Sequence, residues 1–269
     1  MIIKLSIIIP TWNTAQVTLK CIQTIQKHLK NFSYEIIVVD NGSTDNTIPV
    51  LSKTNIKIIK NKQNLGFAKA NNQAVKIAKG EYLLFLNSDM ELIDSSLIDM
   101  FNFINNDPKI GLIGPQFLNI DLSPQASVFP PQTSLNAFKE FWLNIKYSYS
   151  KYLPPLDQPT NISSISGGAV MVKKDFFKKI GCWNELYFFY FEDMDLCRTV
   201  IKTGKSIVYF PLCKVIHRHG FSGQNLAASN KQWRRLIPSS IKYHGVIKHY
   251  FINFIIWSGQ KWQKIIHLK

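Results

Sequence analysis

The chain of 269 residues lacks the features of several large protein classes. Charged residues make up only 18% of it, whereas 46% is hydrophobic and 13% aromatic, so a disordered or low-complexity chain is excluded. No stretch approaches the roughly 20 apolar residues that span a bilayer, because the longest C-terminal apolar run, residues 250–257, is shorter and contains Asn253. The four cysteines show neither CxxC nor zinc-type spacing. This predicts buried, reduced thiols in a cytoplasmic protein.

Several catalytic and targeting motifs are also missing. There is no GxGxxG after the first apolar run, no GxxxxGK[ST] and no GxSxG, which argues against a dinucleotide-binding fold, a P-loop enzyme and an α/β-hydrolase. The first residues, MIIKLSIIIPTWN, look like a signal peptide but have no small-residue cleavage site. They predict a buried strand.

Acidic residues are absent from the last part of the chain. The formal net charge is +15, from 32 Lys and Arg against 17 Asp and Glu, and the last acidic residue is Asp195. From Leu196 onward there are 13 basic residues and no acidic one, so the excess belongs to the C-terminal part. A basic, aromatic-rich tail fits an anionic membrane surface, an anionic substrate or nucleic acid.

The first half alternates strand and helix signals. Apolar runs predict buried strands at residues 4–10, 34–39, 56–59, 81–86 and 110–114. Helical spacing or capping signals between them predict helices at residues 15–29, from 43 or 44, 66–79 and 94–106. Such alternation predicts an α/β fold with a mostly parallel sheet covered on both faces.

The second half is less regular. Seven prolines lie in residues 115–162, which we expect to shape a substrate cleft and to contain a helix near residues 135–147. The remaining patterns predict a strand with a Gly-Gly break at 162–172, a helix at 192–203, a strand at 206–210 closed by Pro211, and a helical tail from Lys231.

Polar clusters follow three predicted strands, as Thr11-Trp12-Asn13, Asp40-Asn41-Gly42 and Asn87-Ser88-Asp89. In parallel sheets, ligands bind outside the carboxyl ends of the strands. Asp40 suits a nucleobase imide or a ribose hydroxyl, but turn-capping is the ordinary role of such a residue. Asp89 suits a divalent cation, or alternatively the N-cap of the next helix.

A second set of candidates lies later in the chain. The segment FFYFEDMD places Glu192, Asp193 and Asp195 at a predicted helix start, where they form either a favourable charged first turn or a site with a general base. Helical spacing splays them, so at most two face one cleft. His217 and His219 are candidate metal ligands or structural histidines.

The order of these segments is more specific than any one of them. SIIIPTWN, EIIVVDNGSTDNT, NLGFAKANNQA, YLLFLNSD, SGGAVMVKK, FFYFEDMDLC and HRHGFS together span about residues 5–222. In this order and spacing the chain resembles family 2 inverting glycosyltransferases of the GT-A fold. It is most similar to the rhamnosyltransferase-like group that builds bacterial surface polysaccharides.

The resemblance implies a role for each matching residue. Asp40 would recognise the base, and Asn87-Ser88-Asp89 occupies the DXD position, whose last acid would hold Mg²⁺ or Mn²⁺ on the diphosphate. Asn87 replaces the first acid, and Asn71 stands at a basic position of the family motif. The other implied nucleotide-binding residues are Thr11, Asn13, Gly66 and Asn72.

The catalytic and acceptor side is implied in the same way. Asp193 would be the catalytic base, with Glu192 orienting the acceptor or the loop. His217 would complete the metal site, and is preferred to His219 because the spacing HxxGxS starts there. Gly167, Gly168 and Asp195 would bind the acceptor.

The predicted protein is thus a GT-A domain over residues 1–230, with a nucleotide-binding half near 1–114, an acceptor-binding half near 115–230, and a basic helical extension at 231–269. It would move a sugar, with rhamnose as the candidate, from a nucleoside-diphosphate sugar to a glycan or lipid-linked acceptor, without binding nucleic acid. We expect it in the cytoplasm, peripherally on the inner face of the plasma membrane.

Two other classes compete with this prediction. One is a non-catalytic α/β module that binds an anionic membrane or nucleic acid through its basic tail, and such a module does not need Asp89, Asp193 and His217 together. The other is a nucleotidyltransferase. That class usually has a Gly-rich loop with Arg or Lys after the first strand, which PTWNTAQ lacks.

Overall fold

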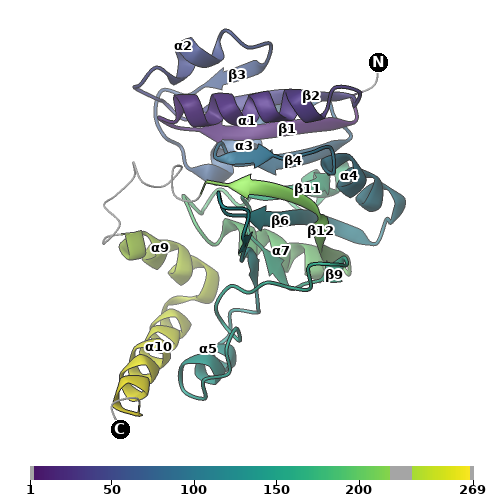
Figure 1. The fold of residues 1–269 in the computed structure, drawn as a ribbon. Helices are drawn as coiled ribbons and strands as arrows, with labels where there is room; N and C mark the ends of the chain where they lie inside the picture. Colours follow the sequence, from purple (N-terminus) through teal and green to yellow (C-terminus); the bar gives the residue numbers. More distant parts are fainter. Residues whose placement is uncertain (1–2, 219–231, 267–269) are drawn as a thin grey trace.

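The computed structural model describes residues 3–218 and 232–266. Within them a central sheet has the strand order β3-β2-β1-β4-β11-β6-β12-β5, with β7 beside β6 and β9 beside β12 (Figure 1). A second, two-stranded sheet pairs β10 with β8. The strands are β1 (Leu5–Thr11), β2 (Tyr34–Asp40), β3 (Lys57–Lys60), β4 (Tyr82–Leu86), β5 (Met90–Leu92), β6 (Ile110–Leu118), β7 (Pro124–Gln125), β8 (Val128–Phe129), β9 (Thr160–Asn161), β10 (Ser164–Ile165), β11 (Ala169–Lys173) and β12 (Ser206–His217).

Helices pack on both faces of the sheet because its strands are apolar on both sides. Ile7 and Ile9 of β1 share a core with α1 and α4, whereas Ile8 faces α3, α6 and α7. This alternation is the period-2 geometry of a strand. The helices are α1 (Ala15–His28), α2 (Thr47–Leu51), α3 (Phe67–Ile77), α4 (Leu97–Asn106), α5 (Ser134–Phe141), α6 (Lys174–Lys179), α7 (Glu192–Lys202), α9 (Gln232–His244) and α10 (Val246–Ile266).

The predicted mostly parallel sheet is confirmed. β1 runs parallel to β2 and β4, β2 to β3, and β6 to β12, while β11 lies antiparallel between β4 and β6. Thr11 and Asp40 are register partners at the carboxyl ends of β1 and β2. Two of the polar clusters therefore meet at one edge, and β4 brings the third beside them.

Two sequence predictions about local structure were wrong. The strand from Ser206 does not end at Pro211 but continues to His217, with a register shift against β6 between Phe210 and Lys214. Proline is tolerated at such an irregularity because a ladder hydrogen bond is already missing there. The helix near 135–147 is shorter and ends at Phe141. The longer β12 matters most, because it pairs His217 with Met90 beside Asp89.

The C-terminal segment is helical, as predicted, and packs on the rest of the chain. α10 and α5 lie side by side below the sheet (Figure 1), where Ile252 and Ile255 pack against Ala137. Gly259 permits this contact, since a Cβ there would lie 2.6 Å from the carbonyl oxygen of Phe141. None of the helices in the described part of the chain is long and apolar enough to cross a membrane.

Gly80 is expected to be essential for the junction between α3 and β4. Its N–H donates to the Ser6 hydroxyl at 2.8 Å, and a Cβ would lie 2.4 Å from the Ser6 nitrogen. Because that neighbour is backbone, we predict that Gly80→Ala lowers the free energy of unfolding by about 1–3 kcal/mol. Urea denaturation measures this.

Gly204→Ala is the matched control. Gly204 has φ +80° but nothing within 4 Å of the added Cβ, so its cost is the backbone strain of about 1–2 kcal/mol alone. A Gly80→Ala protein as stable as wild type would show that β1 and the α3–β4 junction shift apart freely.

Candidate active site

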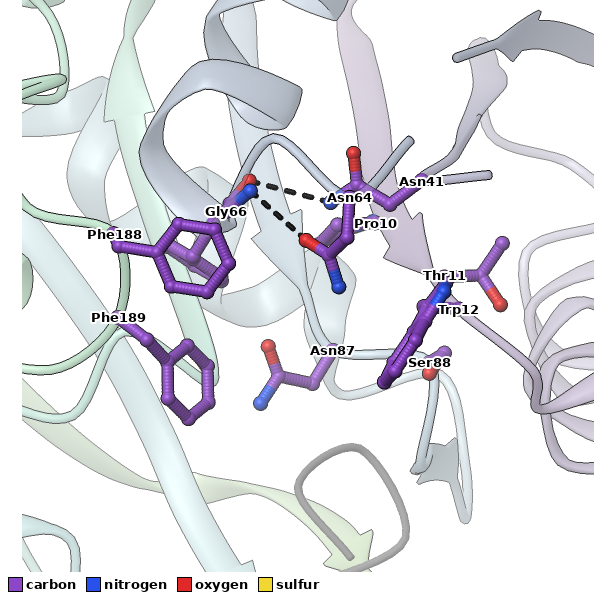
Figure 2. Close-up of a pocket in the computed structure, with 11 residues that line it drawn as sticks. Pro10, Thr11, Trp12, Asn41, Asn64, Gly66, Asn87, Ser88, Phe188 and Phe189 are labelled. Carbon is purple, nitrogen blue, oxygen red and sulfur yellow. Dashed lines mark hydrogen bonds between the residues drawn. The ribbon is translucent and has the colours of Figure 1, made fainter. Parts of the chain in front are cut away.

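A small pocket lies at the carboxyl ends of β1 and β4 (Figure 2). The Asn41 amide donates to the Gly66 carbonyl at 3.2 Å, and the Gly66 N–H donates to the Asn64 side chain at 2.9 Å. Gly66 has φ +85°, and a Cβ would lie 2.4 Å from the Phe188 carbonyl oxygen, so only glycine fits. The lining residues are Pro10, Thr11, Trp12, Asn41, Asn64, Gly66, Phe67, Asn87, Ser88, Phe188 and Phe189.

Aromatic rings narrow this pocket. Figure 2 shows Phe188 and Phe189 on one side and Trp12 on the other, with Asn87 between them. The pocket has a volume of about 60 Å³, whereas ligand sites usually measure about 300–1,000 Å³. The rings therefore leave little room between them.

Of the predicted nucleotide-binding residues Thr11, Asn13 and Asp40, only Thr11 lines this pocket. Thr11 lines it, and its hydroxyl lies 2.7 Å from that of Thr18. The Asn13 side chain instead accepts from the Thr44 N–H at 2.7 Å and so holds the turn that follows β2. Asp40 is buried; its Oδ2 accepts from the Ser43 N–H at 3.1 Å, while Oδ1 has no hydrogen-bond partner among residues 3–218 and 232–266.

Asn72, another predicted nucleotide-binding residue, does not line this pocket. Its amide donates to the Trp183 carbonyl and to Glu185, both at 2.9 Å, and accepts from the Trp183 N–H at 3.2 Å. These bonds tie α3 to the segment before α7. Asn41 and Asn64 line the pocket instead, and Asn41 was visible in the sequence only as part of the Asp40-Asn41-Gly42 turn.

Asp89 and His217 meet where β12 passes the end of β4. Nε2 of His217 lies 3.7 Å from Oδ1 of Asp89, and Nδ1 lies 2.6 Å from Oε1 of Gln125. Asp89 is buried, and the His217 side chain is 15% exposed. His219 lies outside the described residues.

This pair fits a hard or borderline divalent cation. Carboxylate oxygen and imidazole nitrogen are ligands for Mn²⁺, and carboxylates for Mg²⁺. In the part of the chain that the structure describes, no three His, Cys, Asp or Glu side chains gather as a metal site. Asp89 and His217 could hold an ion only with further ligands, such as the phosphates with which Mg²⁺ is usually bound.

Asp193 is held in place by main-chain donors. Its Oδ2 accepts from the Gly167 N–H at 3.1 Å, and its Oδ1 accepts from the Met194 N–H at 2.8 Å. Burial raises the pKa of Asp193 despite these hydrogen bonds. For the buried Glu192, burial and the Asp193 charge raise the pKa well above its ordinary value.

The Gly167-Gly168 pair connects this carboxylate to the end of β4. A Cβ on Gly167 would lie 3.2 Å from that of Asp193, and one on Gly168 would lie 2.8 Å from the Met90 methyl group. The Gly168 carbonyl accepts from the Asn87 N–H at 2.8 Å. The two glycines thus allow their own backbone to pack closely against Asp193 and Met90. Both also line the cavity described below.

Asp195 lies on another side of α7, as the helical spacing predicted for at least one of the three acids. It is paired with Arg198 and accepts from the Asn184 amide at 3.0 Å. It lines a hollow with Asn72 and Glu185 and does not meet Glu192 and Asp193. The structure therefore does not place Asp195 where an acceptor would meet Asp193.

The loop before α7 separates the two sides of the site. Tyr190 and Phe191 have φ of 72° and 67°, a left-handed conformation that costs roughly 1–2 kcal/mol for each non-glycine residue. Carbonyl contacts hold this loop: Phe188 accepts from the Phe67 N–H at 3.0 Å, and Phe189 accepts from the Ser239 hydroxyl at 2.8 Å. Strain maintained in this way is typical of functional sites.

A cavity of about 780 Å³ opens on the other side of this loop. It reaches from Asp89, Asn87 and His217 past Glu192 and Asp193 to the C-terminal helices. Side chains that sequence reasoning did not assign make up most of its wall, because nothing in their local pattern distinguishes them from other loop or helix residues. They include Phe129, Gln132, Tyr149 and Lys151 from the Pro-rich segment, Leu236, Ile237 and Ser240 of α9, and His249, Tyr250, Ile252, Asn253 and Ile256 of α10.

Comparison with known proteins gives the class. The model of glycosyl transferase family 2 matches residues 6–181. The chain belongs to this family and has its GT-A fold.

Its relatives include proteins named as sugar transferases. It is 26% identical over 226 residues to N-acetylglucosaminyl-diphospho-decaprenol L-rhamnosyltransferase of Mycobacterium tuberculosis, covering 73% of this chain and 72% of that protein. It is 36% identical over 107 residues to poly(ribitol-phosphate) beta-glucosyltransferase of Bacillus spizizenii, and this match covers 37% of this chain and 17% of that protein. The fold is similar to that of GalNAc-T7 with UDP, GalNAc and Mn²⁺, with TM-score 0.65 and 15% identity over 82% of this chain and 45% of that one.

Glu192 is expected to destabilise the folded protein at neutral pH. Because its folded-state pKa is raised, its contribution to stability is fully present below the ordinary value of about 4.3 and declines as pH rises through the raised pKa. Glu192→Gln removes this titration. We predict that its melting temperature exceeds that of wild type, by a margin that grows from about pH 4 to pH 8.

Glu81→Gln is the control, since the Glu81 side chain is 52% exposed. Thermal melts of the three proteins across this pH range make the comparison. A Glu192→Gln margin that is constant with pH, or parallel to that of Glu81→Gln, would contradict the raised pKa.

Proposed function

We propose that the protein transfers a sugar from a nucleoside-diphosphate sugar to an acceptor hydroxyl with inversion, and that Asp193 is the general base. The observation that carries this proposal is the position of Asp193 in one cavity with Asp89 and His217. Asn87 lines both this cavity and the small pocket. A donor in the small pocket would therefore present its reacting carbon toward the Asp193 side.

The small pocket is the proposed nucleotide site. Asn41, Asn64 and Asn87 supply amide groups, and Trp12 supplies an aromatic face. The buried Oδ1 of Asp40 is suited to accept from the imide N–H of a uracil or thymine base, since leaving a buried carboxylate oxygen without a donor costs free energy. Thr11, Gly66 and Ser88 complete the walls.

Asp89 and His217 would hold Mg²⁺ or Mn²⁺ at the diphosphate. When bound, the ion would neutralise the negative charge that builds on the leaving diphosphate. The GalNAc-T7 complex with UDP and Mn²⁺ supports this assignment as a structural parallel. Asn87 in place of a first acid leaves Asp89 as the carboxylate ligand of this motif.

Asp193 would take the proton of the acceptor hydroxyl while that oxygen attacks the sugar carbon. The Gly167 and Met194 N–H groups hold its carboxylate, and burial makes it a stronger base than an exposed aspartate. An inverting single displacement needs one base and no nucleophilic carboxylate. Glu192, buried beside Asp193, would orient the loop and the acceptor.

The cavity favours an amphiphilic acceptor. Glu192 and Asp193 line it with carboxylates, whereas α9 and α10 contribute the apolar side chains of Leu236, Ile237, Ile252 and Ile256 beside the polar ones of Ser240, His249 and Asn253. A sugar joined to a lipid carrier matches this mixture of polar and apolar walls, as does the lipid-linked acceptor in the name of the Mycobacterium relative. We propose a lipid-linked glycan acceptor and, from the same relative, rhamnose as the sugar.

The exposed side of α10 would bring the enzyme to an anionic membrane from the cytoplasmic side. Ile247, Tyr250, Phe251, Phe254 and Trp257 are each more than half exposed and recur at helical spacing. Nearby lysines include Lys242 of α9 and Lys248, Lys261 and Lys264 of α10. Apolar and aromatic side chains with nearby lysines are the composition of an interfacial helix.

Asp193→Asn tests the assignment of the base. We predict a loss of sugar transfer of about 10²–10⁴-fold, the usual cost of removing a general base. UDP or dTDP binding, measured by calorimetry, should stay within a few-fold of wild type, because Asp193 does not line the small pocket.

Asp175→Asn is the matched control, since Asp175 is also in a helix first turn but is exposed. Transfer is measured with a panel of nucleotide sugars and lipid-linked acceptors. An Asp193→Asn enzyme that keeps more than a tenth of the wild-type rate would reject this residue as the base.

The membrane contact is tested with Phe254→Ser/Trp257→Ser, whose side chains are 60% and 59% exposed. We predict that wild type co-sediments with phosphatidylglycerol-containing vesicles at low salt and that the double variant does so much less. Each lysine near an anionic surface contributes about 1 kcal/mol. Binding should therefore weaken as added salt shortens the Debye length below about 10 Å.

Ile201→Ser/Leu212→Ser serves as the control, because these side chains are also exposed, at 47% and 54%, but belong to α7 and β12. Equal binding of both double variants would show that α10 does not dock. Absence of wild-type binding at low salt would exclude the membrane contact altogether.

A further inference from the structure

The hairpin formed by β6 and β7 carries a series of side-chain hydrogen bonds that ends at His217. β7 pairs antiparallel with β6, so Gln125 stands opposite Phe117. β6 also pairs with β12, where Ile216 is the register partner of Leu118. This arrangement brings Gln125 to His217, 92 residues further along the chain, with 2.6 Å between Oε1 and Nδ1.

This series of hydrogen bonds begins at Asp121 and passes through three uncharged side chains. The Ser123 hydroxyl donates to Asp121 Oδ1 at 2.6 Å, and the Asn119 amide donates to the Ser123 oxygen at 2.9 Å. The Gln125 amide nitrogen donates to the Asn119 oxygen at 2.8 Å. Hydrogen bonds from Ser123 lower the pKa of Asp121, so its carboxylate is an acceptor only.

Because Asp121 can only accept, every hydrogen bond in the series is donated in the direction of Asp121. With Asp121 accepting, Ser123 must donate to it, and each amide then has its nitrogen toward Asp121 and its oxygen toward His217. Gln125 therefore presents Oε1, which cannot donate, to Nδ1 of His217. The hydrogen of a neutral imidazole must be on Nδ1, and Nε2 then carries the lone pair.

We propose that Gln125 is a positioning residue that holds His217 in the Nδ1–H tautomer, with the Nε2 lone pair directed toward the cation site at Asp89. The inference rests on the proposed function only for the identity of that site. Nε2 is the ring nitrogen on the Asp89 side, 3.7 Å from Oδ1. The Phe117 ring, in edge contact with the imidazole at 5.4 Å between centroids, limits rotation of the ring.

The partner of the other ring nitrogen, here Gln125, matters because a metal binds only the unprotonated nitrogen of an imidazole. Loss of a hydrogen-bond partner of a ligating histidine typically lowers metal affinity by about 10–100-fold. The chain also explains why the hairpin carries Asn119, Asp121, Ser123 and Gln125, none of which lines the small pocket or the large cavity.

The first test reads the tautomer directly. Long-range ¹H–¹⁵N NMR of the full chain at about pH 8, where an ordinary imidazole is neutral, identifies His217 by the signals that disappear in His217→Asn. We expect the Nδ1–H pattern in wild type and in Gln125→Glu, which retains an acceptor. Gln125→Leu should lose this pattern, and Asn119→Ala should show a mixture. A wild-type signal of the Nε2–H form would overturn the proposal.

The second test measures the effect on metal binding. Calorimetry of UDP and of dTDP, each with Mn²⁺ and with EDTA, gives the enhancement by the ion. We expect Gln125→Leu to reduce it about 10–100-fold and Gln125→Glu to restore it, while Gln158→Leu, an exposed glutamine of the same segment, leaves it unchanged. Equal enhancement in Gln125→Leu and wild type would overturn the positioning role.

Asp89→Ala separates this inference from the proposed function. If Mn²⁺ strengthens nucleotide binding in wild type and in Asp89→Ala alike, the proposed metal site is wrong, and with it the purpose assigned to the tautomer. If Asp89→Ala abolishes the enhancement but Gln125→Leu does not, the metal site stands and the role of Gln125 fails.

Discussion

The backbone at Gly167 and Gly168 is the constraint on which the rest of the site depends. One peptide N–H holds the Asp193 carboxylate, and the next residue's carbonyl holds the main chain of Asn87. The proposed base on α7 and the proposed donor side at the end of β4 are thus connected through a few atoms. A Cβ on Gly167 would lie only 3.2 Å from the Asp193 Cβ, and one on Gly168 would push the Met90 methyl group, 2.8 Å away. The spacing of the two halves of the site is therefore set by the main chain just before β11, the strand that lies antiparallel between β4 and β6.

The loop before α7 is the other shared element. Its aromatic residues form a wall of the small pocket on one side and of the large cavity on the other. Two left-handed residues strain it, and contacts with α3 and α9 maintain that conformation. Because this loop belongs to both walls, a movement of the loop would change the small pocket and the large cavity together. The C-terminal helices thus support the site as well as carrying positive charge.

Charge and polarity are unevenly distributed along the chain. The first 195 residues are nearly balanced, and the carboxylates of the proposed site all belong to them. The basic and aromatic end of the chain forms α9 and α10, which line the large cavity and expose aromatic rings. One helix, α10, therefore has both a face that packs on α5 and a face with exposed aromatic rings.

Local pattern determined much of this protein. Alternating apolar runs and amphipathic segments were sufficient for the α/β sheet, and polar clusters after apolar runs located the edge where β1, β2 and β4 end. The ordered motifs were sufficient for the family. These features are readable because a buried strand or an amphipathic helix imposes its period on neighbouring residues.

Tertiary structure decided what depends on distant partners. Asn72 ties α3 to Trp183, Asp195 faces Arg198, and β12 continues through Pro211 because β6 and β5 pair with it. The cavity wall from α9 and α10, and the contact of Gln125 with His217, join residues far apart in sequence. A hydrogen bond or a packed ring leaves no period in the sequence around it, so only the folded chain shows which residues meet.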